Sequence, residues 1–363
     1  MPLDDTSRLL ATAPTIEIDG QNYPTVASNL ERMRMMESLG GLSTLELVLT
    51  DATTGSDGGA IFASSGSNSP LKLGAGVRVF AGAAEDSAKE IFDGQVTAIE
   101  AEIREAGPPL FTILAEDRLF PARRKRRSRL FEAKSLGDVV NQFASDYGLT
   151  PQIRDGLDTG TRDWMQVDET DLCFLRRILD TSDADMQMVG DKLQVGRTGK
   201  DQRALVPLAP GDTLKWARMT ADIADQVSKV RLATWDAKQG SAVDATKDSG
   251  GFGPGTGKTG KDVLADKFAE VVMQLGRMGP MSDADAENRA QYEADRRARA
   301  FVSVTGTAVG NGQIRIGTWI ELSSVTAQFA NQYSVTRAVH RWDRKSGYLT
   351  DFDAQSAYMG DPQ

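Results

Sequence analysis

The stretch "DETDLCFLRRILDTSDADMQMVGDKLQVGR", residues 168–197, changes its pattern halfway along. Its first half spaces four apolar residues along one stripe of an amphipathic helix, namely Leu172, Leu175, Ile178 and Leu179. Its second half turns over Gly190-Asp191, and a glycine-containing dipeptide between two apolar runs is typical of a hairpin. A helix followed directly by a hairpin predicts an α+β unit at this place.

A second helix is predicted just upstream, in "SLGDVVNQFASDYG", residues 135–148. Ser135 is a suitable N-cap because Asp138 follows three residues later, and Gly148 is a suitable stop. The apolar residues between them fall on one side, namely Leu136, Val139, Val140, Phe143 and Tyr147. We therefore assign residues 119–200 to a small α+β unit with two helices and a hairpin.

Strand patterns precede this unit. In "LSTLELVLTD", residues 42–51, Leu45, Leu47 and Leu49 fall on one face, which is the period of a half-buried strand. Similar strands are predicted in "TIEIDG", "GVRVFAG", "EIFDGQVTAIEAEI" and "PLFTILAED". A Gly/Ser-rich loop, residues 51–70, interrupts them. We expect residues 1–118 to form an antiparallel β-barrel unit.

Strand patterns also follow the α+β unit. They are "SKVRLATWD", "QIRIGTWIEL", "QYSVTRAVHRWD" and "GYLTDFDAQS", within residues 228–356. We assign residues 201–355 to a second β-barrel unit and residues 356–363 to a C-terminal tail. The predicted fold class is β-rich α+β, with two antiparallel β-barrel units flanking a small α+β unit.

Two segments interrupt the second β unit. Residues 239–262 are rich in Gly, Ser, Thr, Lys and Asp, and this composition predicts a flexible linker. Residues 283–302 predict a long helix because alanine recurs every four residues, at Ala286, Ala290, Ala294 and Ala298. On its exposed side, Glu293 with Arg297 and Asp295 with Arg299 are spaced for ion pairs.

The composition is that of an ordinary globular chain, with 40% hydrophobic and 26% charged residues over 363 positions. A net charge of −9 argues against a dedicated nucleic-acid-binding protein, and the N-terminus lacks the apolar core of a secretory signal. No apolar run approaches the roughly 18 to 20 residues of a membrane helix. One cysteine, Cys173, and one histidine, His340, are a poor inventory for catalysis, so we expect no enzyme, metal or cofactor.

The segment "FGPGTGKTG", residues 252–260, resembles a nucleotide-binding loop. The motif G-x-x-x-x-G-K-[ST] requires glycine five positions before Gly257, where this chain has Phe252. The motif must also leave a buried strand, and the upstream residues contain no apolar run. An ATPase is therefore disfavoured against a glycine-rich linker.

Other candidate catalytic residues have simpler structural explanations. His340 lies in a strand pattern, where a packed or hydrogen-bonded histidine is expected. Cys173 lies off the apolar stripe of its helix, with no charged partner to activate it. Asp183 and Asp185 could serve a glycosidase as paired carboxylates, but acidic residues just beyond a helix are common. The methionines of "LERMRMME" predict a flexible apolar contact, at Met33, Met35 and Met36.

The basic run "RRKRR" could suggest phosphate binding, and it comprises Arg123, Arg124, Lys125, Arg126 and Arg127. Specific nucleic-acid binding would also need stacking aromatics or a wider basic face, which an acidic chain does not indicate. We interpret the run as a solvated loop or as a patch that contacts another subunit or a channel.

Three stretches together resemble the phage late-control D and VgrG-type tail-hub family. They are residues 164–195, residues 305–354, and the weaker series "FDGQVTAIEAEI", "LFTILAEDRLF" and "LFEAKSLGDVVNQFASDYGL". In the second stretch the matching positions are Gly306, Gly310, Gly317, Tyr333, Val335, His340, Gly347, Tyr348, Thr350 and Phe352. The resemblance covers most of residues 92–354.

The resemblance implies a structural baseplate hub. Its two tail-tube-like barrels per chain would give a homotrimer six barrels, which match a hexameric tail tube above and a trimeric spike below. It also implies contacts with other baseplate components and with cargo or a tape-measure protein, and assembly in the bacterial cytoplasm into a phage tail or injection particle. VgrG-type chains continue into a spike, so the spike is expected to be a separate protein. The alternative is an enzymatic tail-tip component, either a cell-wall hydrolase or a P-loop NTPase.

Overall fold

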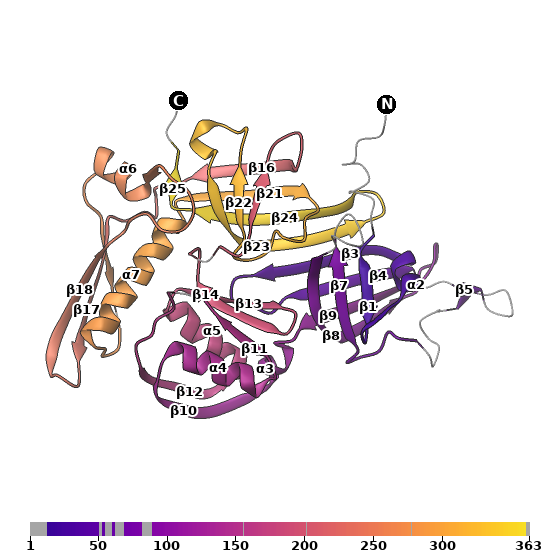
Figure 1. Cartoon of the computed structure of the whole chain (residues 1–363), viewed down its shortest axis with the longest axis horizontal. Coiled ribbons are helices and arrows are strands. Elements are labelled where there is room, and N and C mark those ends of the chain that lie inside the picture. The colour runs from indigo at the N-terminus through magenta and orange to yellow at the C-terminus, as the bar shows by residue number, and fades with distance from the viewer. Residues whose placement is uncertain are drawn as a thin grey trace.

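The computed structural model of the chain is built mainly of strands, and its two β-rich parts lie next to each other beside a smaller part that carries helices (Figure 1). It describes residues 13–50, 53–54, 60–61, 69–81, 89–154, 156–200, 202–276 and 278–360, of which 53–54 and 60–61 are described only as backbone. The predicted β-rich α+β class is confirmed.

One large sheet runs through both β units. The strands of the first unit are β1 (Thr15–Ile18), β2 (Gln21–Asn22), β3 (Leu30–Ser38), β4 (Thr44–Thr50), β7 (Gly76–Ala81), β8 (Lys89–Glu102) and β9 (Leu110–Asp117). Those of the second are β15 (Leu205–Leu208), β16 (Leu214–Ala221), β21 (Val302–Val309), β22 (Trp319–Leu322), β23 (Gln332–Asp343) and β24 (Gly347–Ser356). Hydrogen-bonded neighbours follow the order β16-β21-β24-β23-β3-β4-β9-β8-β7-β1-β2, and β22 and β15 branch from β23.

The two β units share one strand order. Across the sheet, six strands of the first unit follow one another as β1, β7, β8, β9, β4 and β3. Counted by their order along the chain, these are the first, fourth, fifth, sixth, third and second strands. The strands β15, β16, β21, β22, β23 and β24 lie in the same order. One pair differs, because β1 and β7 are antiparallel whereas β15 and β22 are parallel. The chain therefore contains one topology twice.

Local irregularities repeat as well. The pairing of the fifth strand with the sixth shifts its register after Val96 in the first unit and after Val335 in the second. Gly74 N donates to Val96 O at 2.8 Å, and Gly317 N donates to Val335 O at 3.2 Å. Both glycines have positive φ, a conformation that glycine adopts without steric cost. These matches support a structural repeat beyond shared strand order.

The two units are joined side by side within the sheet. Residues 32–38 of β3 pair antiparallel with residues 337–343 of β23. The same edge of β23 pairs with β22 at residues 332–334. One strand of the first unit thus completes an edge of the second.

The α+β unit contains both predicted helices, α4 and α5, and a third short helix, α3, that was not predicted. Its elements are α3 (Phe120–Arg124), β10 (Arg126–Lys134), α4 (Leu136–Asp146), β11 (Thr150–Ile153), β12 (Arg162–Thr170), α5 (Asp171–Thr181), β13 (Ala184–Val189) and β14 (Lys192–Arg197). Ser135 and Asp138 form a reciprocal capping box at the start of α4. The turn between β13 and β14 contains Gly190, as expected.

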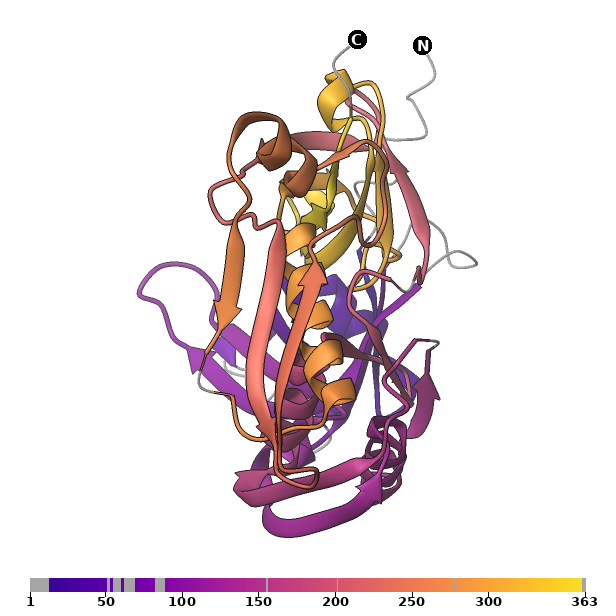
Figure 2. The same ribbon diagram turned by 90° about the vertical axis from the view of Figure 1, so that its left-hand side faces the viewer.

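A lateral layer lies beside the second β unit. It contains the sheet β18 (Ser241–Asp248), β17 (Lys229–Asp236) and β20 (Val272–Leu275), with α7 (Asp283–Arg299) packed across it (Figure 2). The predicted alanine stripe is confirmed, since Ala286, Ala290 and Ala294 are buried in this layer's own core. Small side chains let the helix lie close to the sheet.

The prediction of a flexible linker over residues 239–262 is wrong. Residues 241–248 form β18, where Val243 and Ala245 alternate into the core beneath α7. The segment then continues through β19 (Lys258–Thr259) into α6 (Gly260–Lys267). The predicted tail is also partly ordered, because β25 (Tyr358–Met359) pairs with β19. The composition predicts flexibility because the segment has few large apolar residues, but tertiary contacts order it.

The remaining elements are short. They are α2 (Pro24–Ser28), β5 (Thr53–Thr54), β6 (Ala60–Ile61) and the 3-10 helix η2 (Ala327–Phe329). In "QIRIGTWIEL" only β22 is a strand, although Ile314 and Ile316 are buried as expected. The predicted Gly/Ser-rich loop, residues 51–70, lies largely outside the described residues. In the described part of the chain, no helix combines the length and apolar content needed to span a membrane.

Candidate functional site

A buried ion pair lies where the two β units meet. Glu37, on β3, is 2% exposed and accepts a hydrogen bond from Arg315 Nη2 at 2.7 Å. Ile316 N also donates to Glu37 Oε1, at 2.8 Å. Burial disfavours the charged form, but the charge and hydrogen bonds of Arg315 outweigh it, so the pKa of Glu37 lies below its ordinary value.

Polar contacts extend this pair into the α+β unit. Gln187, on β13, donates to Glu37 Oε1 at 3.2 Å and accepts from Arg203 Nη1 at 2.8 Å. Arg203 also forms an ion pair with Asp185, at 2.8 Å. One connected group of buried side chains therefore contacts all three units, and it fixes their relative positions because each member depends on the others for its hydrogen bonds.

His340 belongs to the same buried contact between units, and such a contact is called a joint below. It is fully buried on β23, and its Nδ1 lies 2.7 Å from the hydroxyl of Tyr348. Burial lowers the pKa of His340 to about 4, and Arg315 acts in the same direction although Glu37 opposes it. The imidazole is therefore neutral at pH 7, as a packed and hydrogen-bonded strand histidine. This agrees with the sequence-based interpretation.

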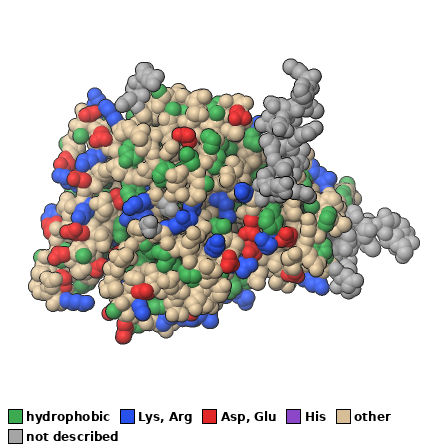
Figure 3. All heavy atoms as spheres, in the orientation of Figure 1, with side chains coloured by type: hydrophobic (Ala, Val, Ile, Leu, Met, Phe, Trp, Pro, Cys, Tyr) green, Lys and Arg blue, Asp and Glu red, His purple; other side chains and the backbone are tan. Residues whose placement is uncertain are grey.

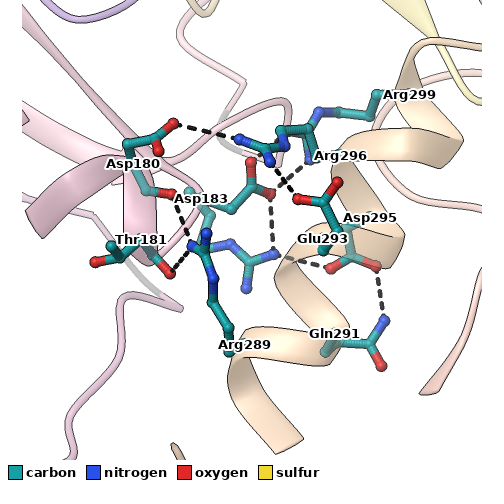
Figure 4. A network of polar contacts seen from close by, with 10 residues as sticks. Asp180, Thr181, Asp183, Arg289, Gln291, Glu293, Asp295, Arg296 and Arg299 are labelled. Atoms are coloured by element: carbon teal, nitrogen blue, oxygen red, sulfur yellow. Dashed lines mark hydrogen bonds and ion pairs between the residues drawn. The ribbon is translucent and has the colours of Figure 1, made fainter. Parts of the chain in front are cut away.

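A second buried network joins the α+β unit to α7 (Figure 4). Asp183 follows α5 and accepts from Arg299 Nη1 at 2.8 Å, while Arg197 Nη2 donates to Asp295 Oδ2 at 2.8 Å. All four side chains are less than one-tenth exposed. Arg289 from α7 donates to the carbonyl of Thr181 at 2.7 Å, at the carboxyl end of α5.

This network corrects two predictions about α7. Asp295 and Arg299 do not pair with each other on an exposed side, since both point into the joint and bond to Arg197 and Asp183. Glu293 does pair with Arg297, at 3.1 Å, but its side chain is only 4% exposed. The error arises because residues four apart on a helix share a face whether that face is wet or buried.

The two carboxylates that could serve a glycosidase form ion pairs within these buried contacts. Asp183 pairs with Arg197 and Arg299, and Asp185 pairs with Arg203. Both line a cavity of about 660 Å³, but each is buried and its carboxylate is already held by an arginine. Among the described residues, no group of three or more His, Cys, Asp and Glu side chains could hold a metal ion.

The nucleotide-loop-like segment is also occupied by structural contacts. Thr259 caps α6, where its hydroxyl accepts from Asp262 N and donates to the Asp262 carboxylate. Lys258 pairs with Asp266 at 3.4 Å. The ring of Phe252 lies about 5 Å from the guanidinium groups of Arg197 and Arg299. This segment therefore closes the second network rather than presenting free groups to a phosphate.

The basic run does not form a single loop. Arg123 and Arg124 end α3, whereas Arg126 and Arg127 begin β10 on the other side of Lys125. Their ionic partners belong to this chain, because Arg123 pairs with Glu116, Arg126 with Asp168, and Arg127 with Asp146 and Asp171. The run is therefore not a loop, although Arg123, Arg124, Lys125 and Arg126 are exposed to solvent and local carboxylates pair with most of its arginines.

A groove of about 670 Å³ follows the outer face of the first β unit beside α3. Its lining includes Arg34, Glu46, Arg123 and Arg124. Elsewhere, acidic, basic and hydrophobic side chains are interspersed over the face in Figure 3. Cys173 is exposed on α5, as expected for a residue off the apolar stripe.

Asp117 stands where the chain leaves the first β unit. It is 2% exposed and accepts from Ser43 N at 2.6 Å and from Leu119 N at 2.9 Å. Burial raises the pKa of Asp117 to about 6, although these two hydrogen bonds oppose the shift. This carboxyl is therefore a titratable element of the connection between units.

Strand β3, and with it Glu37, differs from the sequence-based expectation of a flexible methionine contact. Met33, Met35 and Glu37 alternate into the interior, and the two methionines belong to the first core. The period-two signal was present. The charged Glu37 at an inward position argued against a buried strand, because a carboxylate is buried only with a partner. That partner, Arg315, lies 278 residues away in the sequence.

Comparison with solved structures shows the fold. The chain aligns with the prophage MuSo2 43 kDa tail protein from Shewanella oneidensis at a TM-score of 0.69 and 13% identity, over 95% of this chain and 98% of that one. It aligns with the E. coli c3393 protein, described as a component of the type VI secretion system, at 0.60 and 11%, over 96% and 79%. It aligns with a chain of the Francisella PdpA-VgrG complex at 0.55 and 10%, over 98% and 54%.

The fold is therefore that of phage tail proteins and type VI secretion tail components. No curated protein matches the sequence. The family model described as the Alg8 N-terminal domain matches residues 9–343, and the chain belongs to that family.

Proposed function

From the tail-protein fold, we propose that the chain is the structural baseplate hub of a contractile tail or contractile injection system. In this proposal a homotrimer joins a hexameric tail tube to a trimeric spike. The observation that carries it is the repeated β topology, since one chain presents two units with the same strand order. Three such chains present six similar units, and a ring of six can match a sixfold tube while its chains keep threefold symmetry.

The buried joints support a rigid connecting role. Glu37–Arg315 and Asp183–Arg299 tie units together through interior ion pairs that lose much stability when one partner is removed. Such joints hold the two β units in one fixed relation, as ring geometry requires. The carboxylates considered for catalysis serve these joints, which favours a structural role over a tail-tip hydrolase.

Within this proposal, Arg123 and Arg124 face either the lumen or a neighbouring component. They line the groove, and Arg124 has no ion pair with any other residue that the structure describes. Replacing both with serine is expected to leave the trimer intact and to weaken assembly with a tube, tape-measure or cargo protein. Unchanged assembly and delivery would remove this assignment.

Native mass spectrometry of the purified protein tests the proposal. The expected species is a trimer of the 39.2 kDa chain, which co-purifies with a tube or spike protein when these are co-expressed. Addition of ATP is expected to leave the melting temperature unchanged. A monomer that binds ATP or cleaves peptidoglycan would contradict the hub assignment.

A further inference from the structure

We propose that Asp117 and Arg315 form a proton-sensitive contact, in which the ionised Asp117 carboxylate shares the guanidinium that also binds Glu37. The joint between the two β units then responds to pH. This response goes beyond the proposed function, because it depends on the joint within one chain and not on how copies of the chain assemble.

The two side chains share a small cavity. Asp117 and Arg315 both line it, and its volume is about 10 Å³. A space of this size holds about one water molecule at most. Little solvent can therefore screen the carboxylate from the guanidinium.

Asp117 is held by backbone amides. Its carboxylate accepts from Ser43 N at 2.6 Å and from Leu119 N at 2.9 Å, and it forms no ion pair within the part of the chain that the structure describes. Burial raises the pKa of Asp117, whereas the backbone hydrogen bonds and the positive charge of Arg315 lower it. Arg315 is therefore the cation that stabilises the ionised form.

The other carboxylates of the cavity lining have cations of their own. Glu90 pairs with Arg78 at 2.8 Å, and Asp93 pairs with Arg118 at 2.9 Å. The β13–β14 hairpin lines the cavity only with uncharged residues. The remaining carboxylate is that of Asp117, so its ionisation depends on the guanidinium that shares the cavity.

Arg315 is already engaged by Glu37. Its Nε donates to Glu37 Oε2 at 3.1 Å, and its Nη2 donates to the same oxygen at 2.7 Å. When Asp117 is protonated, the guanidinium neutralises one carboxylate. When Asp117 loses its proton to solvent, the same guanidinium faces two carboxylates. These then compete for one cation, and this competition couples the ionisation of Asp117 to the joint by a free energy that acts equally in both directions.

The sign of the coupling follows from the charges. Removal of Arg315 takes away a positive charge that favours the ionised carboxyl, so Asp117 should then titrate at higher pH. Removal of the Glu37 charge takes away a negative charge and frees the guanidinium, so Asp117 should then titrate at lower pH. Each shift is expected to be about one pH unit or more.

Unfolding of matched pairs of the full-length chain tests the contact. In each pair the second member carries Asp117→Asn, and the difference in unfolding free energy is measured with urea between about pH 4 and 9. Both members share every other titrating group, including His340, so the difference reports Asp117 alone. In the parent pair this difference should change with pH up to about 6 and then level off.

Three further pairs distinguish the contact from a general effect of charge. The pH at which the difference levels off should rise by about one unit or more with Arg315→Met and fall by a similar amount with Glu37→Gln. Glu37→Gln keeps the shape of the side chain, so it carries the test if Arg315→Met fails to fold. The matched control is Arg118→Met, which should leave the levelling pH unchanged because Arg118 is adjacent to Asp117 in the sequence but pairs with Asp93.

The same levelling pH in the parent, Arg315→Met and Glu37→Gln pairs would overturn the contact. A shift with Arg118→Met as large as that with Arg315→Met would also overturn it, since Asp117 would then respond to net charge and not to this guanidinium. Neither result depends on the oligomeric state, so the hub proposal stands or falls separately.

Discussion

Strands β3 and β16 hold the same place in the two β units, and they differ in what lies along their outer edge. β3 is covered by β23, whereas no described strand covers β16. The difference extends to the side chains, because Met35 is fully buried while the equivalent Met219 is partly exposed. Equivalent positions in a repeat thus differ in burial with the strand that lies beside them.

The largest expected loss of stability comes from breaking the buried Glu37–Arg315 ion pair between the two β units. Arg315→Met leaves the Glu37 carboxylate buried without its partner and should lower the free energy of unfolding by about 3–5 kcal/mol. Chemical denaturation measures it. The matched control is Arg231→Met, which removes an exposed ion pair with Asp244 and should leave the unfolding midpoint unchanged. If both substitutions lowered the free energy of unfolding equally, the buried ion pair would contribute no more stability than the exposed one.

The next prediction compares the two strands directly. Met35→Ala deletes a fully buried side chain and should cost about 2–5 kcal/mol of unfolding free energy. Met219→Ala, at the equivalent position, should cost roughly 1 kcal/mol at protein concentrations where the chain is monomeric. Urea titrations of both variants at low concentration measure the difference. A larger loss for Met219→Ala would contradict the comparison.

A pH effect distinguishes the ends of the two units. Asp117 in the first unit corresponds to Ser356 in the second, through the registers of β9 and β24. The pKa of Asp117 is raised by burial to about 6 in the folded chain, so ionisation disfavours the folded state. Its destabilisation is absent below its unfolded pKa, near 4, and grows to at most about 3 kcal/mol as the pH rises through 6.

Asp117→Asn should remove this part of the pH dependence, because the amide does not ionise in this range. Unfolding of both proteins between pH 4 and 7 measures it. Ser356→Ala is the matched control at the equivalent position, and it should leave the slope with pH unchanged. Parallel pH profiles for the parent and Asp117→Asn would exclude Asp117 as the titrating group.

The smallest expected effect on stability falls at the uncovered edges. Trp216→Ser and Ile103→Ser remove exposed side chains and should change the unfolding free energy of the monomer by less than about 0.5 kcal/mol. Both should weaken self-association, as measured by mass photometry across a dilution series. A large loss of monomer stability would mean that these side chains are already covered within one copy.

Short sequence signals predicted those helices that nearby residues determine. The caps at Ser135 and Gly148 bound α4, and alanine spacing placed α7. The joints were not predictable, because Glu37 and Asp295 take partners from distant parts of the chain. The family resemblance implied two similar β units, but the residues alone did not reveal the repeat, since equivalent strands share register shifts and strand order more than side chains. Residues 239–262 were misassigned because their order depends on contacts with α7 and β25.

In the proposed hub, three chains present six similar β units in one ring. A cryo-EM map of the hub bound to its tail tube should show three chains per ring, with six β units in pseudo-sixfold order facing the tube. A ring of six chains, or a hub in which only one β unit of each chain faces the tube, would contradict it.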